Sequence, residues 1–318
     1  MVPLLSRALP DACLREGTRY REASHEDCDS FAGVGVTAAV SVPPSGAQVL
    51  QQSSQDAAVI ERGRYLVETA AFCGVCHNTR GADGQPVSGM ELAGGRIIAE
   101  RGFHAVVPNI TPDQETGIGR WSDVEIAAAV RDGRRPDGRL IGPPMPIELY
   151  RGLSDHDISA MVAYLRAVPP VHHAVTERST YPFPLTPFGP PVGGVPDPPK
   201  DDPVARGAYL AGPVAHCMDC HTPPLPSERR DWPRIGAGGV PFEGPWGAAV
   251  ARNITSSKEH GIGGWTDEQI IRAITQGISA DGRRLAPPMS GRAPIWSQLT
   301  ERDKHDLVAY LRSLPPQE

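Results

Sequence analysis

Four of the six cysteines in this chain of 318 residues occur in two copies of one short pattern. The copies are Cys-x-x-Cys-His motifs, at Cys73, Cys76 and His77 and at Cys217, Cys220 and His221. Two thiols at this spacing can be joined to the vinyl groups of one haem, with the adjacent histidine as the proximal iron ligand. The motifs therefore predict two covalently bound haem c groups.

A methionine follows each motif at the same distance. Met145 and Met289 both lie 69 residues beyond the second cysteine of their motif, and both follow Pro-Pro. A thioether sulfur can complete the coordination of a haem iron and raises its reduction potential, and the prolines stiffen the loop that holds it. We therefore predict two pairs of axial iron ligands, His77 with Met145 and His221 with Met289.

The cysteines and methionines of these motifs also have interpretations other than haem binding. A Cys-x-x-Cys pair can also be a thiol–disulfide redox pair, which needs a βαβ setting that this sequence lacks, or half of a zinc site. A zinc site built from both motifs leaves the two Pro-Pro-Met segments unexplained. For methionine the alternative is core packing, which we predict for the unpaired Met90, Met161 and Met218. We expect structural or solvated roles for the other histidines considered, His104, His172, His173, His216 and His305.

An internal repeat underlies the two motifs. A residue between positions 63 and 145 has its counterpart 144 positions later in the chain. After Met289 the second copy contains two additional residues. Matching segments include Asn109-Ile-Thr with Asn253-Ile-Thr, and Val162–Arg166 with Val308–Arg312. The chain thus divides into a first repeat at 57–168 and a second repeat at 204–318.

The local patterns predict an all-α fold for each repeat. Apolar faces at 57–72 and 204–216 predict helices that lead into the cysteines. Capping boxes at Ser122-x-x-Glu125 and Thr266-x-x-Gln269 predict the start of a second helix, and Ser154 and Thr300 predict the start of a last one. Gly63 and Gly207, which lack a Cβ, would let the first helix cross closely against Tyr164 and Tyr310 of the last.

Residues that could hold loops or haem propionates recur in both repeats. Position and hydrogen-bonding capacity suggest one set in each repeat: Asn109, Thr111, Trp121 and Arg139, and Asn253, Thr255, Trp265 and Arg283. Such a repeat is loop-rich and poor in aromatic residues, so a buried porphyrin would supply much of its apolar core.

The segment between the repeats, 169–203, contains eleven prolines. This composition predicts an extended, semi-rigid connector rather than a plain hinge. We expect it to run along the surface of the repeats, anchored by Tyr181, Phe183 and Phe188.

Charge and hydropathy exclude several classes of partner. The net charge is −6, and the 31 basic residues are 28 arginines and three lysines. This balance disfavours a nucleic acid partner and excludes a docking face ringed by lysines. The sequence contains no run of 18 apolar residues, so we predict no transmembrane segment.

The first 56 residues carry mixed charge and no recognisable signal peptide. Haem c is attached outside the bacterial cytoplasm, so export is required. We therefore predict that 1–56 is a leader or atypical signal region, disordered or removed. Cys13 and Cys28 lie in it, and a disulfide between them is left open.

The repeated motifs resemble class I cytochrome c domains. The segment from Pro108-Asn-Ile-Thr-Pro to Gly-Ile-Gly-x-Trp, with the later Pro-Pro-Met, is similar to the multihaem cytochrome subunits of bacterial membrane-bound alcohol and gluconate dehydrogenases. The resemblance covers 57–168 and 204–318 and implies two tandem class I cytochrome c domains. Those subunits usually carry three haems; two motifs here favour a shorter dihaem relative that serves another periplasmic dehydrogenase.

The function expected from these features is electron transfer without catalysis. A periplasmic dihaem cytochrome c would pass single electrons from a periplasmic or membrane-bound dehydrogenase to an oxidase, a quinone or another cytochrome, free or peripheral to the inner membrane. The rival is a dihaem enzyme, either a peroxidase or a dehydrogenase of a small sulfur compound. Such an enzyme needs an open or unusually ligated iron, whereas both repeats keep a candidate methionine ligand.

Overall fold

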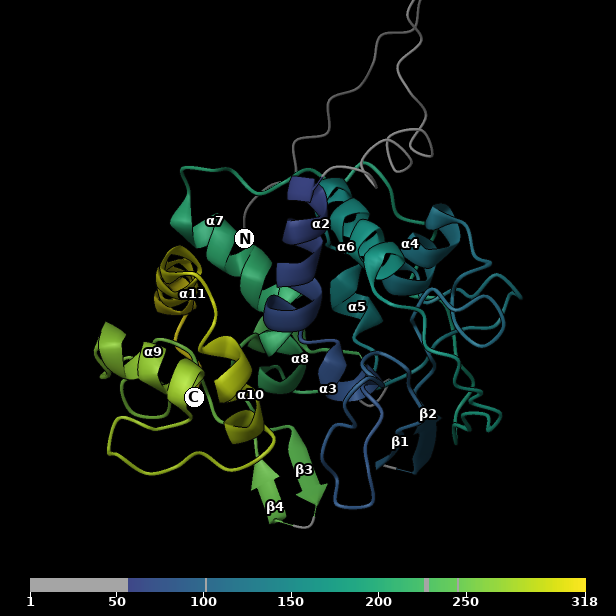
Figure 1. The fold of residues 1–318 in the computed structure, drawn as a ribbon. Helices are drawn as coiled ribbons and strands as arrows, with labels where there is room; N and C mark the ends of the chain where they lie inside the picture. Colours follow the sequence, from purple (N-terminus) through teal and green to yellow (C-terminus); the bar gives the residue numbers. More distant parts are fainter. Residues whose placement is uncertain (1–56, 101, 226–228, 245) are drawn as a thin grey trace, which may run out of the picture. The chain divides into compact units, whose positions relative to one another are not determined.

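The computed structural model describes residues 57–100, 102–225, 229–244 and 246–318 (Figure 1). Cys13, Cys28 and the predicted leader at 1–56 lie outside these residues. The described part is mostly helical, as the capping signals and the apolar periodicity predict.

The order of helices is the same in both repeats apart from one additional 3₁₀ turn. The first repeat contains α2 (Ala57–Arg64), the π-helix η1 (Tyr65–Ala70), α3 (Gly74–His77), α4 (Asp123–Arg131), α5 (Ile147–Tyr150) and α6 (Asp155–Ala167). The second contains α7 (Pro203–Tyr209), the π-helix η2 (Leu210–Val214), α8 (Cys217–His221), the 3₁₀ turn η3 (Trp232–Arg234), α9 (Asp267–Gln276), α10 (Met289–Trp296) and α11 (Glu301–Ser313). The two additional residues of the second repeat coincide with α10, which is longer than α5.

Each repeat also contains a two-stranded antiparallel sheet, so the all-α prediction was wrong on this point. Strand β1 (Ile97–Glu100) pairs with β2 (Phe103–Val106), and β3 (Pro241–Gly244) pairs with β4 (Gly247–Val250) (Figure 1). Each strand is only four residues long, too short for a clear alternation of apolar and polar residues. Gly102 and Gly247, with φ of 82° and 91°, permit the two turns.

The predicted helix caps are present. Ser122 with Glu125 and Thr266 with Gln269 form complete capping boxes at the starts of α4 and α9. At the starts of α6 and α11, the hydroxyls of Ser154 and Thr300 accept hydrogen bonds from backbone N–H groups three residues ahead, both 3.1 Å long. These bonds satisfy donors that a helix start leaves unpaired, which explains why the helices begin at these residues.

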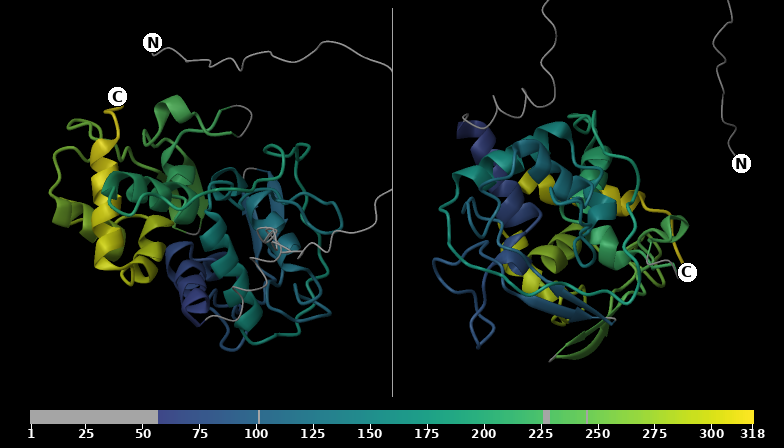
Figure 2. Two further views of the ribbon diagram at one scale, coloured as in Figure 1. Left: turned by 90° about the horizontal axis from the view of Figure 1, so that it is seen from above. Right: turned by 90° about the vertical axis from the view of Figure 1, so that its right-hand side faces the viewer.

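Close crossing of the first and last helix organises each repeat. Helix α2 crosses and contacts α6, and α7 crosses and contacts α11 (Figures 1 and 2). A Cβ added at Gly63 would lie 2.7 Å from the Cβ of Tyr164, and one at Gly207 would lie 2.6 Å from the Cβ of Tyr310. The prediction that glycine is needed at both crossings is confirmed.

The two repeats contact each other through equivalent residues. The hydroxyl of Tyr209 donates a 2.8 Å hydrogen bond to Asp157 and accepts one of 3.1 Å from the backbone N–H of Ser154 at the start of α6. In return, the hydroxyl of Tyr65 donates to Asp303 and accepts from the backbone N–H of Thr300, at the start of α11. Such reciprocal contacts are those of an isologous interface between two like subunits.

One apolar core continues across this interface. Its buried members come from both repeats and include Leu66, Leu153, Leu210, Trp296 and Leu307. Because apolar burial is the main favourable term in folding, the repeats stabilise each other.

The connector lies against described residues of both repeats, as predicted. The Tyr181 hydroxyl donates a 3.1 Å hydrogen bond to the carbonyl of Pro143, and its ring contacts Phe103 and Phe183. The Arg229 guanidinium lies 4.2 Å from the ring centroid of Phe188. Tyr181 and Phe188 therefore contact the repeats as predicted, whereas the ring contact of Phe183 is with Tyr181, within the connector itself.

We expect Gly63→Ala to destabilise the folded protein by about 1–3 kcal/mol, because the added methyl group overlaps the backbone of α6. The matched control is Gly291→Ala in α10, where an added Cβ meets no atom within 4 Å. That control should be neutral or stabilising by about 0.4–1 kcal/mol. Urea unfolding of both variants measures the difference, and equal midpoints would contradict the packing argument.

Candidate functional site

The Cys-x-x-Cys-His motifs lie on two short helices, α3 and α8. The four cysteines are partly buried, and among the described residues they form no disulfide. Burial raises the pKa of the Cys73 and Cys217 thiols to about 12. A thiol–disulfide redox site needs a thiol whose pKa is lowered, so this environment argues against a redox pair of the thioredoxin kind.

The histidine of each motif is held in one orientation by a backbone carbonyl. His77 Nδ1 lies 3.0 Å from the carbonyl oxygen of Pro108, and His221 Nδ1 lies 2.7 Å from that of Arg252. A carbonyl can only accept, so Nδ1 carries the hydrogen and Nε2 keeps its lone pair. Burial lowers the pKa of His77 to about 4 and also lowers that of His221, which keeps both rings neutral at pH 7.

The two carbonyl partners occupy equivalent positions and adjoin the Asn-Ile-Thr segments. Asn109 accepts from the backbone N–H of Thr111 at 2.9 Å and donates to the carbonyl of Val171 at 2.8 Å. Asn253 repeats both bonds, with Thr255 at 2.9 Å and with Gln317 at 2.8 Å. The predicted loop-holding role of these asparagines is confirmed, and the loops they hold carry the acceptors for the histidines.

Met145 and Met289 are half-buried and pack against the same apolar core as Cys73 and Cys217. Met145 lies just before α5, and Met289 is the first residue of α10. Their assignment as iron ligands stays a prediction. Met161 and Met218 are buried members of the core, which confirms the packing role expected of them.

The other predicted histidines have structural or solvent-exposed settings. His173 Nδ1 lies 2.9 Å from the Ala93 carbonyl, and His104 forms an ion pair with Glu177 at 2.7 Å. His172 and His305 are exposed. His216 packs between aromatic rings.

Five arginines have buried Nε atoms with no hydrogen-bond partner among the described residues: Arg80, Arg131, Arg134, Arg135 and Arg272. Arg135 lies over the ring of Trp121, at 5.2 Å from its centroid. In the repeat, the counterpart of Arg135 is Ser279 and not Arg272. The Arg272 guanidinium donates a 3.0 Å hydrogen bond to the carbonyl of Ser279. Four of these arginines belong to the first repeat, where Arg135 Nε lies 3.9 Å from the Asp137 carboxylate, and Arg272 belongs to the second.

The arginines singled out from the sequence have a more local role. Arg139 and Arg283 form ion pairs of 2.6 Å with Asp137 and Asp281 two residues earlier, and both are largely exposed. They therefore hold their own Asp-Gly turns. The internal repeat does not relate Arg135 to Arg272, because the counterpart of Arg135 is Ser279.

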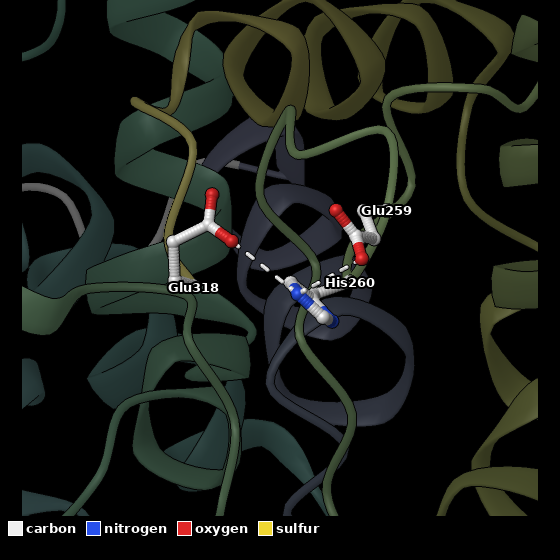
Figure 3. A group of neighbouring side chains, drawn as sticks. All are labelled: Glu259, His260 and Glu318. Carbon is white, nitrogen blue, oxygen red and sulfur yellow. Dashed lines mark ion pairs between the residues drawn. The ribbon is translucent and has the colours of Figure 1, made fainter.

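Within the described ranges, one group of His, Cys, Asp or Glu side chains is close enough to share a metal ion, and it contains no cysteine. It consists of Glu259, His260 and Glu318 (Figure 3). His260 Nε2 lies 3.3 Å from Glu318 and 3.8 Å from Glu259. All three are exposed, as expected for a surface ion pair of little energetic weight. The zinc interpretation of the cysteines gains no support.

Comparison with known proteins identifies the family. The family model described as Cytochrome c matches residues 60–169. A curated relative from Cereibacter sphaeroides, named as a diheme cytochrome c-type protein, is 30% identical over 258 residues, 77% of this chain and 83% of that protein. This chain belongs to the cytochrome c family.

Other relatives of this cytochrome are named as parts of dehydrogenases. The fructose dehydrogenase cytochrome subunit of Gluconobacter japonicus is 33% identical over 270 residues, 80% of this chain and 52% of that protein. The gluconate 2-dehydrogenase cytochrome c subunit of Pantoea cypripedii is 32% identical over 276 residues, 81% of this chain and 60% of that protein. The chain thus spans about half the length of the first of these relatives and three fifths of the second.

Membership of the cytochrome c family implies covalently bound haem c, and the residues present fit that group. Cys73 and Cys217 pack against the apolar core, and Nδ1 of each motif histidine faces a backbone carbonyl, which leaves Nε2 as the atom that can bind iron. The buried Nε atoms of Arg135 and Arg272, which have no hydrogen-bond partner among the described residues, could donate to propionate carboxylates. Over the described residues, no helix has the length and apolar character needed to cross a membrane.

We expect the stability of the protein to fall less steeply with acid when His216 is replaced. Burial, opposed by Asp219 and reinforced by Arg292, lowers the pKa of His216 from 6.5 to about 4. Between these values the unfolded chain binds the proton and the folded protein does not, so acid favours unfolding. His216→Phe should therefore lose less stability than the wild type between pH 7 and pH 5, by about 1–2 kcal/mol.

Urea unfolding of the full chain at the two pH values measures this difference. His305→Phe, at an exposed histidine of α11, is the matched control and should follow the wild type. If His216→Phe loses as much stability as the wild type between the two pH values, the acid sensitivity does not come from His216.

Proposed function

We propose that this cytochrome is a dihaem electron-transfer protein with two tandem cytochrome c domains, at 57–168 and 204–318, joined by the connector. One haem would be attached to Cys73 and Cys76, and the other to Cys217 and Cys220. The axial ligands would be His77 with Met145 and His221 with Met289. The observation that carries the proposal is the equivalent bond from Nδ1 of each motif histidine to a backbone carbonyl.

Each residue of the proposed sites has a defined task. The carbonyls of Pro108 and Arg252 fix the tautomer and ring orientation of the histidines, so that Nε2 is the atom left to bind iron. The Pro-Pro segments restrain the backbone before Met145 and Met289. When bound, a haem c with histidine and methionine ligands takes up and releases single electrons.

The propionates of the two haems would be received by Arg135 and Arg272. A buried donor that lacks a partner is energetically costly, and a carboxylate is the partner that a guanidinium binds best. The buried Nε atoms of Arg135 and Arg272 have no hydrogen-bond partner among the described residues, which supports this assignment.

An enzymatic role is the less favoured alternative. A peroxidase or a sulfur-compound dehydrogenase would need an iron with an open or exchangeable position. Each repeat supplies a candidate methionine at the same spacing, and each methionine packs against the core. The proposed protein therefore transfers electrons without binding a substrate at iron.

The proposed electron donor is a periplasmic or membrane-bound dehydrogenase. Several relatives are named as cytochrome subunits of dehydrogenases for fructose, alcohol and gluconate, which supports this class of partner. The proposed acceptor is an oxidase, a quinone or another cytochrome. The proposed location is the periplasm, free or at the inner membrane, because the enzymes that attach haem c act outside the bacterial cytoplasm.

The absorption spectrum of the oxidised protein tests the number of haems and their ligands. The purified protein should contain two haems per chain by the pyridine haemochrome assay, and they should survive acid-acetone extraction. Met145→Ala and Met289→Ala should each remove about half of the far-red band that reports a Met–iron bond, and should lower one reduction potential.

Met90→Ala, at a half-buried methionine in a loop of the first repeat, is the matched control and should leave the band unchanged. A band that survives in full in either ligand variant would refute the corresponding ligand. High-spin features or peroxide turnover in the wild-type protein would favour the enzymatic alternative.

Arg135→Gln should lower the reduction potential of one haem and leave the other within error. The physical reason is that a nearby cation stabilises the reduced haem, which carries one positive charge fewer than the oxidised haem. Arg272→Gln should lower the potential of the other haem. Redox titration followed by absorbance measures both, and Arg139→Gln is the exposed control. Unchanged potentials in Arg135→Gln would rule out Arg135 as the propionate partner.

A further inference from the structure

Four rings form a continuous cluster at the interface between the repeats. The rings of Phe72 and His216 lie 4.6 Å apart between centroids. Phe72 also contacts Trp296 edge-on at 5.2 Å, and His216 contacts Tyr150 edge-on at 5.8 Å. Phe72 and His216 are equivalent positions of the repeat, and so are Tyr150 and Trp296. The cluster is thus built reciprocally, like the tyrosine contacts described above.

The two central rings immediately precede the haem-attachment motifs. Phe72 is bonded to Cys73, and His216 is bonded to Cys217. Both adopt a left-handed backbone, with φ of 41° and 40°, a conformation that costs free energy in residues other than glycine. The same strained conformation in both repeats directs the two rings toward each other.

The surroundings hold these rings in place. Trp296 is buried, and its indole N–H donates a 3.3 Å hydrogen bond to the carbonyl of Ala70. The Arg292 guanidinium lies 5.3 Å from the ring centroid of Phe72. Phe72, Tyr150 and Trp296 are all members of the buried core that the two repeats share. The contact between the central rings is therefore closely packed.

We propose that the contact between Phe72 and His216 is the route by which an electron passes between the two haems of one chain. This inference rests on the proposed function. Covalent bonds connect Cys73 to Phe72 in one repeat and His216 to Cys217 in the other. The path between the two cysteines is non-covalent at one point, where the rings of Phe72 and His216 touch. Electron tunnelling decays more steeply through space than along bonds. Two rings in contact keep the through-space part of the path short and therefore favour transfer.

The step involves no making or breaking of bonds. One electron would leave the reduced haem of one repeat and be gained by the oxidised haem of the other, so charge would balance within the chain. Phe72 and His216 are positioning residues here, because they act through the cysteines beside them. A merely structural role would affect stability and leave the rate of exchange unchanged.

The test uses the full-length protein with both haems in place. In partly reduced protein, NMR exchange between the haem methyl resonances gives the rate of electron exchange within a chain, identified as the part independent of protein concentration. Phe72→Leu and His216→Leu should each slow this exchange several-fold. His216→Phe retains a ring at the contact and should stay close to the wild-type rate.

Phe183→Leu is the matched control, because it removes a phenylalanine ring from the connector, outside the four-ring cluster. Its exchange rate should equal that of the wild type. Haem content and the far-red band are measured in every variant, so that loss of a haem is not mistaken for loss of the route.

Two outcomes would overturn the inference. One is a wild-type exchange rate in a Phe72→Leu protein that still carries two methionine-ligated haems. The other, which decides the matter if Phe72→Leu fails to fold, is an equal rate in His216→Leu and His216→Phe. A wild-type protein with fewer than two haems would instead refute the proposed function.

Discussion

The hydrogen bond from Nδ1 of each motif histidine to a backbone carbonyl is the interaction on which the rest of the repeat depends. The acceptor lies 31 residues further along the chain, so the intervening loop and hairpin must fold back onto the motif. Asn109 and Asn253 hold the adjoining loop to the chain that follows the last helix. The last helix in turn packs on the first, which leads into the cysteines. Orientation of one imidazole thus depends on the loop that supplies the carbonyl and, through it, on the first and last helices of the repeat.

The contact between the repeats adds a second level of organisation. Tyr65 and Tyr209 each reach across to the start of the last helix of the other repeat, where unpaired backbone donors are available. Each repeat therefore completes a helix start of its neighbour while adding apolar residues to a common core. The residues that precede the two cysteine motifs meet within this interface. The same packing that stabilises the repeats also brings the residues that precede the two cysteine motifs into contact.

Sequence patterns predicted the parts that depend on local chemistry. Capping boxes, the glycines at the helix crossings and the aromatic anchors of the connector are present where expected. The two hairpins were missed because four-residue strands leave little periodicity to detect. Arg135 and Arg272 were missed because they do not match in the repeat and their buried Nε atoms are recognised only in the folded structure. The meeting of Phe72 and His216 depends on how the repeats pack, which no local pattern encodes.

The connector changes the thermodynamics of this reciprocal interface. Two separate subunits with the same contacts would associate only as far as their concentration allowed, whereas tethered partners experience an effective concentration on the order of millimolar. The interface can then remain closed with modest intrinsic affinity, at any dilution of the protein. Because the connector is itself held to both repeats through Tyr181 and Phe188, little chain entropy is left to oppose closure. The two repeats of one chain therefore stay paired with each other even when a cell makes very little of the protein.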